Sequence, residues 1–159
     1  MNVTLICMGR LKEDYLKSAC AEYQKRLSGF CRFTVEEIEA ERLPDDPSDS
    51  EIAAALEKEG ERILAKIPRG AYTIALCIEG KQQTSEELAE LIRHIPVWGS
   101  GSAAFIIGSS FGLSDKVKAS AQLKLSMSKM TFPHQLARVM LMEQIYRAYS
   151  IINNRRYHK

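Results

Sequence analysis

Five short apolar runs recur along the chain, separated by longer segments of mixed polarity. They cover residues 3–8, 33–38, 72–78, 103–107 and 123–127. Each run has the length of a strand, and most end at glycine, serine or another turn-forming residue. The runs therefore predict five strands, and the nearly unbroken apolar character of the third and fourth is typical of strands covered on both faces.

The segments between these runs predict helices. In residues 13–27 the apolar positions recur at steps of three and four, which makes one apolar stripe on a helix. Ser48 and Thr84 are each followed three residues later by glutamate, the spacing of a capping box that begins a helix. A short helix is expected from about Ser114, and a long one within residues 133–152, where a proline stands near the first turn.

Strands that alternate with helices imply right-handed crossovers and an α/β fold with a mostly parallel sheet of five to six strands. The length of 159 residues, without a repeat or linker, predicts a single domain over 1–159. Ligands of such sheets bind outside the carboxyl ends of the strands. The loops after Ile78, Ile107 and Met127 are therefore the expected functional region.

The loop after Ile107 contains two glycines but matches neither the dinucleotide-binding pattern nor the Walker A pattern. Gly108 and Gly112 would allow a close approach of the backbone to a flat ligand, or a positive φ. A plain turn between strand and helix explains these residues equally well.

The last helix is apolar on nearly all sides, which a surface helix of a small monomer should not be. Either it lies centrally in the fold or it packs against a second copy, and we favour a dimer. Glu143 and Arg147 are four residues apart and could pair on this helix, although Arg147 could equally face a ligand.

Composition limits the protein class. Hydrophobic residues make up 45% and charged residues 26% of the chain, so it should fold. The absence of a membrane-spanning run of roughly 20 residues or a signal peptide predicts a soluble, cytoplasmic protein without membrane contact. The four cysteines lack C-x-x-C spacing and are expected to be reduced, and the three histidines are too far apart in sequence to predict a metal site.

Charge is distributed unevenly. Residues 1–114 contain 13 Lys and Arg against 18 Asp and Glu, whereas residues 115–159 contain 9 against 2. The basic part could attract a polyanion such as nucleic acid, or it could be a solvated face. The terminal segment 153–159 combines cations with Tyr and His, which suits RNA, although a frayed terminus has the same composition.

Several motifs together resemble one family closely. They are Ile106-Ile107-Gly108-x-x-x-Gly112-Leu113, Ser126-Met127-Ser128-Lys129-Met130-Thr131-Phe132-Pro133-His134-Gln135, Glu143-Gln144-Ile145-Tyr146-Arg147-Ala148 and the terminal Tyr157-His158-Lys159. The chain resembles, over essentially its whole length, the ribosomal large-subunit methyltransferase H family of the SPOUT superfamily. The resemblance implies a homodimer that uses S-adenosylmethionine to methylate N3 of a pseudouridine in 23S rRNA of the assembled ribosome, and a Rossmann-like fold with a trefoil knot.

The resemblance also implies roles for individual residues. The cofactor site would comprise Leu76, Glu79, Gly80, Gly108, Gly112, Met127, Ser128, Lys129, Met130, Thr131 and Phe132. RNA contacts would fall on His134, Arg138, Arg155 and Arg156, and the catalytic group on Arg147, Tyr157, His158 and Lys159. His158 would be the base, Arg147 or Lys159 would stabilise the anion, and the tail would complete the pocket of the partner subunit. Ser109 stands where the family commonly has glycine, and a positive φ there would be strained.

Two alternatives from other classes fit parts of the pattern. A non-catalytic RNA-binding α/β dimer would use the same basic tail. A doubly wound enzyme that uses another nucleotide would have the same order of strands, but it would not need residues 157–159.

Overall fold

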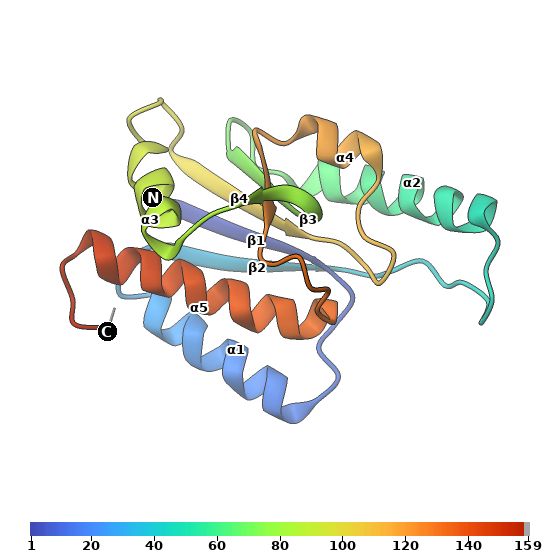
Figure 1. Cartoon of the computed structure of the whole chain (residues 1–159), viewed down its shortest axis with the longest axis horizontal. Helices are drawn as coiled ribbons and strands as arrows, with labels where there is room; N and C mark the ends of the chain where they lie inside the picture. The colour runs from blue at the N-terminus through green and yellow to red at the C-terminus, as the bar shows by residue number, and fades with distance from the viewer. Residues whose placement is uncertain (158–159) are drawn as a thin grey trace.

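A five-stranded parallel sheet is the framework of the protein, with strand order β2-β1-β4-β3-β5 (Figure 1). The computed structural model describes residues 1–157. The strands are β1 (Asn2–Met8), β2 (Arg32–Ile38), β3 (Tyr72–Gln82), β4 (Ser102–Ile107) and β5 (Leu123–Ser126). The predicted α/β fold with a parallel sheet is confirmed, and β3 is the strand that extends well beyond its apolar run.

Within residues 1–157, five helices alternate with the strands. They are α1 (Asp14–Leu27), α2 (Asp49–Lys66), α3 (Ser85–His94), α4 (Asp115–Ser120) and α5 (His134–Ile152). Both predicted capping boxes form: the hydroxyls of Ser48 and Thr84 accept hydrogen bonds from the backbone N–H groups of Glu51 and Glu87. Such a cap stabilises a helix by about 1 kcal/mol.

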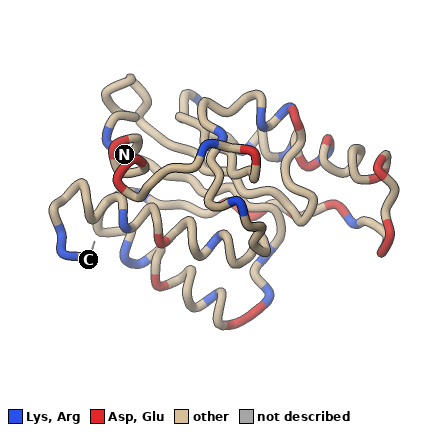
Figure 2. The backbone as a smooth tube through the Cα atoms, viewed as in Figure 1, with Lys and Arg blue, Asp and Glu red and all other residues tan. Residues whose placement is uncertain are grey.

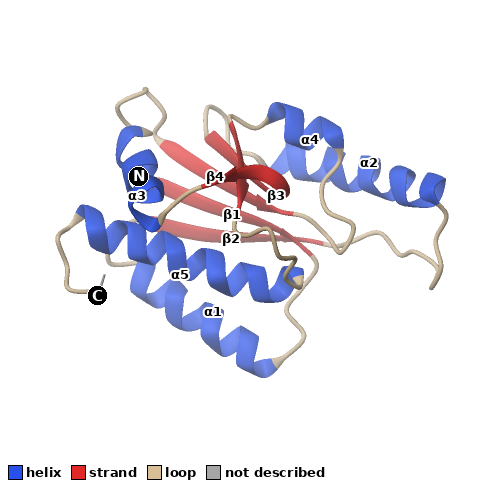
Figure 3. Ribbon diagram, viewed as in Figure 1, coloured by secondary structure: helices blue, strands red, loops and turns tan. Residues whose placement is uncertain are grey.

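The helices cover both faces of the sheet (Figure 3). Along β1, Val3 and Leu5 pack with α1, α3 and α5, while Ile6 and Met8 pack with α2 and α4. This alternation follows from the two-residue period of a strand. It makes two hydrophobic layers with the sheet between them and leaves the carboxyl edge of the sheet to the loops.

Helix α5 lies between α1 and α3 on one face of the sheet. Leu141, Met142 and Ile145 are buried there. This central position is one of the two explanations for the apolar character of the helix. The second copy of the chain stays a prediction.

The four cysteines Cys7, Cys20, Cys31 and Cys77 are free thiols, as expected. Within residues 1–157, no helix combines the length and the apolarity that crossing a membrane requires. The same residues contain no group of three or more His, Cys, Asp or Glu side chains arranged to hold a metal ion.

Strand β3 pairs with β5 twice. Ile74–Leu76 pair with 123–125, and after a break in register Lys81 and Gln82 pair with Leu125 and Ser126. Between the two paired parts the backbones approach so closely that a Cβ on Gly80 would lie 2.7 Å from backbone atoms of Lys124 and Leu125. The bend of β3 over β5 therefore requires glycine at this position. The trefoil knot that the family resemblance implies stays a prediction.

The close contact between β3 and β5 at Gly80 predicts what a methyl group at this position would do. Gly80→Ala should lower the free energy of unfolding by about 1–3 kcal/mol, because backbone atoms cannot yield as a flexible side chain does. Gly101→Ala is the control, since no atom lies near the new Cβ, and its effect should stay within about 0.5 kcal/mol. Chemical denaturation of the two variants measures the difference, and equal effects would contradict the assignment.

Candidate functional site

A cleft of about 740 Å³ lies at the carboxyl ends of β4 and β5, beside the middle of β3. Three chain segments and the side chain of Lys118 line it: the segments are residues 76–79, residues 107–113, and residues from 125 to the first turn of α5. Two of these segments are the loops expected after Ile107 and Met127. The third belongs to β3, which continues to Gln82, so the loop expected after Ile78 is strand in the structure. The volume is typical of a cleft for a small molecule.

Most of the expected cofactor residues meet in this cleft. Nine of the eleven line it: Leu76, Glu79, Gly108, Gly112, Met127, Ser128, Met130, Thr131 and Phe132. The other two do not belong to its walls. Gly80 lies at the crossing of β3 and β5, and Lys129 is exposed.

The glycine loop is packed tightly against itself. A Cβ on Gly108 would lie 2.2 Å from the carbonyl oxygen of Gly112, and Gly112 has a φ of +87°. Ser109 does not have a positive φ, so the strain expected at this serine is absent. Its hydroxyl donates instead to Glu59 at 2.9 Å, which turns the side chain toward α2.

Exposed apolar side chains surround the mouth of the cleft. Ile78 is 58%, Phe111 48% and Met130 73% exposed. Large apolar side chains gathered at one exposed place commonly mark a binding surface. Of the three, Met130 was expected from the family motif. In the sequence, Phe111 is an aromatic residue between two glycines, which indicates a candidate binding loop. Ile78 cannot be distinguished from the end of a buried strand.

One ion pair stands at the wall of the cleft. Lys118 of α4 donates to a carboxylate oxygen of Glu79 at 2.6 Å, and this hydrogen bond lowers the pKa of Glu79. Glu79 is therefore ionised at neutral pH. Burial raises the pKa of the neighbouring Cys77, so this thiol stays protonated. Nothing in the sequence near Lys118 distinguishes it from other surface lysines, and sequence reasoning missed it.

The two expected RNA contacts on α5 have different environments. His134 lines the cleft, and burial together with the charges of Arg138 and Lys12 lowers its pKa. Arg138 is only 2% exposed, and its guanidinium donates to Glu37 at 2.9 Å and to the carbonyl of Gly9 at 2.8 Å. We correct the expectation for Arg138: it holds the start of α5 against the loop after β1 and presents no guanidinium to RNA.

The expected catalytic residues lie away from the cleft of their own chain, as far as the structure describes them. Arg147 follows His134 by 13 positions, or roughly 20 Å along the helix. It donates to Glu143 at 2.6 Å, and the hydroxyl of Tyr157 also contacts Glu143, at 3.2 Å. The predicted pair of Glu143 and Arg147 is thus confirmed. His158 and Lys159 lie outside the described residues.

The basic excess of the C-terminal part is partly neutralised within the fold. Besides Arg138 and Arg147, Lys116 pairs with Glu57 at 3.7 Å and Lys118 with Glu79. Blue and red stretches are both scattered over the largely tan backbone (Figure 2). Arg155 and Arg156 are exposed, with Arg155 over the ring of Phe30 at 4.6 Å.

Comparison with known proteins identifies the family. A family model described as "Predicted SPOUT methyltransferase" matches residues 1–158. A ribosomal RNA large subunit methyltransferase H from Clostridium novyi (strain NT) is 51% identical over 159 residues, 100% of each chain. One from Bacillus pumilus (strain SAFR-032) is 48% identical over the same length.

The chain belongs to the ribosomal RNA large subunit methyltransferase H family. A solved structure supports the fold of this SPOUT family member. A crystal structure described as a probable methyltransferase from Bordetella pertussis Tohama I superposes with a TM-score of 0.57 and covers 92% of this chain and 95% of that chain. The two chains share 18% sequence identity, so the likeness concerns the fold alone.

The lowered pKa of His134 predicts a pH dependence of stability in this family member. The unfolded chain binds a proton to this imidazole more readily than the folded chain, so protonation favours unfolding. As pH falls below about 6.5, the ordinary value for histidine, wild type should lose more unfolding free energy than His134→Gln. Urea denaturation at pH 7.5 and pH 5.5 measures this, and an identical loss in both proteins would contradict the lowered pKa.

Proposed function

We propose that this protein transfers a methyl group from S-adenosylmethionine to N3 of a pseudouridine in 23S ribosomal RNA of the ribosome, and that it acts as a homodimer. The observation that carries the proposal is the cleft at the carboxyl edge, in which nine of the eleven residues expected for the methyl donor come together. Full-length relatives at about half identity are named as methyltransferases of large-subunit ribosomal RNA.

The residues of the cleft fit the chemistry of S-adenosylmethionine. A side chain on Gly108 would clash with Gly112, so the loop has only backbone at this position, and its N–H and C=O groups would read the edge of an adenine. Leu76 and Met127 offer apolar contacts to the faces of the base. Glu79, which is ionised, can accept hydrogen bonds from sugar hydroxyls. When bound, the donor supplies an electrophilic methyl group on a sulfonium.

The work of the protein is to position the acceptor and to remove its proton. The imide N3–H of pseudouridine becomes a good nucleophile only when it loses that proton, so a base and a neighbouring cation are required. We assign the base to His158 and the stabilisation of the anion to Arg147 or Lys159, with Tyr157 beside them. Holding the two reactants together with water excluded accounts for much of the expected rate.

The distance between cleft and tail supports a site made by two chains. Helix α5 has 19 residues, roughly 28 Å at 1.5 Å per residue, with the cleft at its first turn and the tail beyond its last. Tyr157 folds back against Tyr146, with ring centroids 4.7 Å apart. Tyr157 therefore does not line the cleft of its own chain, and we propose that the C-terminal tail, residues 153–159, of a second chain completes the site.

RNA would approach across the mouth of the cleft. His134 stands there with a neutral imidazole, and the exposed Arg155 and Arg156 would reach the phosphates from the partner's tail. The cytoplasm, which contains the ribosomes, would be the compartment of the reaction.

The direct test is methyl transfer. Labelled S-adenosylmethionine is incubated with the protein and either ribosomes or naked 23S rRNA, and the modified nucleotide is mapped. We expect incorporation into ribosomes at N3 of one pseudouridine, and binding of the donor in a calorimetric titration. RNA binding without any heat from S-adenosylmethionine would favour the non-catalytic RNA-binding dimer instead.

Deletion of residues 157–159 separates the two parts of the site. We expect this deletion to abolish methylation while the affinity for S-adenosylmethionine stays nearly unchanged, because no cleft residue is removed. Equilibrium titration and turnover of the truncated protein measure the two effects, and unchanged turnover would contradict the role of the tail.

Mixed dimers provide the control for a site shared between chains. The truncated chain is co-expressed with a Gly108→Ala chain, whose new Cβ would lie 2.2 Å from the Gly112 oxygen and distort the cleft. Random pairing makes half of the dimers mixed, and each mixed dimer has one intact site of two, formed by the cleft of the truncated chain and the tail of the Gly108→Ala chain. The mixture should therefore recover about a quarter of wild-type activity. A mixture as inactive as its components would exclude the shared site.

A further inference from the structure

Glu59 is the one acidic side chain that is buried among residues 1–157, with 4% of its surface exposed. A buried carboxylate is costly unless hydrogen bonds replace its water. One oxygen of Glu59 accepts the backbone N–H of Glu41 at 2.9 Å, and the other accepts the hydroxyl of Ser109 at 2.9 Å. Both hydrogen bonds are charge-assisted, which makes them stronger than neutral ones.

The contact with Ser109 reaches the wall of the cleft. Ser109 follows Gly108 in the glycine loop, and its carbonyl accepts the N–H of Gly112 at 2.9 Å, which closes the turn. The next residue of α2, Gly60, supports the end of the same loop: a Cβ there would lie 2.5 Å from the hydroxyl of Ser114. Helix α2 thus lies directly behind the loop at both of its ends.

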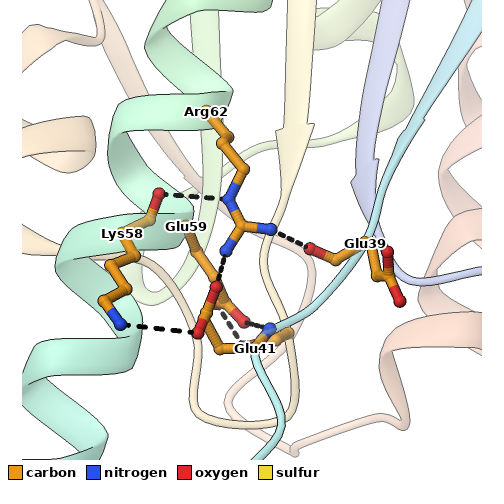
Figure 4. Close-up of polar contacts among 6 residues, drawn as sticks. Glu39, Glu41, Lys58, Glu59 and Arg62 are labelled. Carbon is orange, nitrogen blue, oxygen red and sulfur yellow. Dashed lines mark hydrogen bonds and ion pairs between the residues drawn. The ribbon is translucent and has the colours of Figure 1, made fainter.

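The opposite side of Glu59 is held by a charged network (Figure 4). Arg62 donates to the carbonyl of Glu39 at 2.7 Å and pairs with the carboxylate of Glu41, which also lies 3.9 Å from the ammonium of Lys58. These contacts fasten the segment after β2 to α2. The N–H of Glu41 is therefore a fixed donor, and the carboxylate of Glu59 cannot turn away from Ser109 without losing that donor.

We infer that Glu59 is a positioning residue for the methyl donor: through Ser109 it holds the glycine loop in the shape that the cleft offers to the ligand. The inference rests on the proposed function, in which this cleft takes S-adenosylmethionine. A loop that is already ordered binds its ligand without an added entropy cost, and a loop released from Glu59 must be ordered during binding. The loss should therefore appear in donor affinity.

Calorimetric titration with S-adenosylmethionine tests the inference on a set of variants. Ser109→Ala removes only the hydroxyl and should weaken binding about 3- to 10-fold, and Glu59→Ala about 10-fold or more. The double variant should bind no more weakly than Glu59→Ala alone, since both changes remove the same contact. Glu59→Gln should stay within about threefold of wild type, because its amide can still accept from Glu41 and donate to Ser109.

Glu61→Ala is the matched control. This glutamate also belongs to α2, but its side chain is exposed and takes no part in the network around Glu41, so donor affinity should not change. Steady-state kinetics give a second readout: KM for the donor should rise in Ser109→Ala while KM for the RNA stays constant. A merely structural role would lower the active fraction, and hence kcat, at unchanged KM.

The outcomes distinguish this inference from the proposed function. If wild type binds the donor and folded Ser109→Ala binds it equally well, or if the effects of the two alanine variants multiply, the positioning role of Glu59 is wrong and the function stands. If Glu59→Ala does not fold, Ser109→Ala and Glu59→Gln decide. If wild type itself gives no binding, the proposed function fails and the inference fails with it.

Discussion

Contact of backbone with backbone at two glycines is the constraint on which the site depends. At Gly80 the bend of β3 meets β5, and at Gly108 the loop after β4 meets its own far end at Gly112. A side chain at either position would push apart segments that must share one edge of the sheet. Because the segments 76–79, 107–113 and 125–137 lie so close together, their apolar and polar groups line one cleft. The cleft therefore depends on having glycine, which has no Cβ atom, at Gly80 and Gly108.

Helix α5 connects this cleft to the rest of the molecule. Its first turn forms part of the cleft wall, its middle fills the core between α1 and α3, and its last turns bring the aromatic and basic tail back along the helix. Among the described residues of one chain, Arg147 and Tyr157 meet at Glu143 on this helix and do not line the cleft. A site that needs both the cleft and the tail is most simply built by two chains, and that is the physical basis for the dimer in our proposal.

Hydrophobic periodicity was sufficient for the order of the elements, because strands and helices of a parallel α/β fold bury different, regular subsets of their residues. It was insufficient wherever structure depends on distant partners. The end of β3 is polar, and its pairing with β5 over 40 residues away has no local signal. Arg138 stands in a basic segment and resembles a ligand contact, yet Glu37 and Gly9, more than a hundred residues earlier, enclose it. Most of the cleft residues came from the family motif, while Ile78 and Lys118 required the fold.

The two buried charges of residues 1–157 have a common place in this arrangement. Arg138 holds the loop after β1 and Glu59 holds the loop after β4, and both loops leave the carboxyl edge of the sheet. A buried charge adds little net stability, since desolvation offsets most of its attraction, and an apolar residue of similar size often serves the core as well. A buried charge instead fixes the positions of its partners, because its hydrogen bonds form only when the donor or acceptor lies at the correct distance and angle. Charges buried at this edge therefore fix where the loops lie, and a site that must hold a methyl donor and an RNA base within reach of each other depends on that accuracy more than on stability.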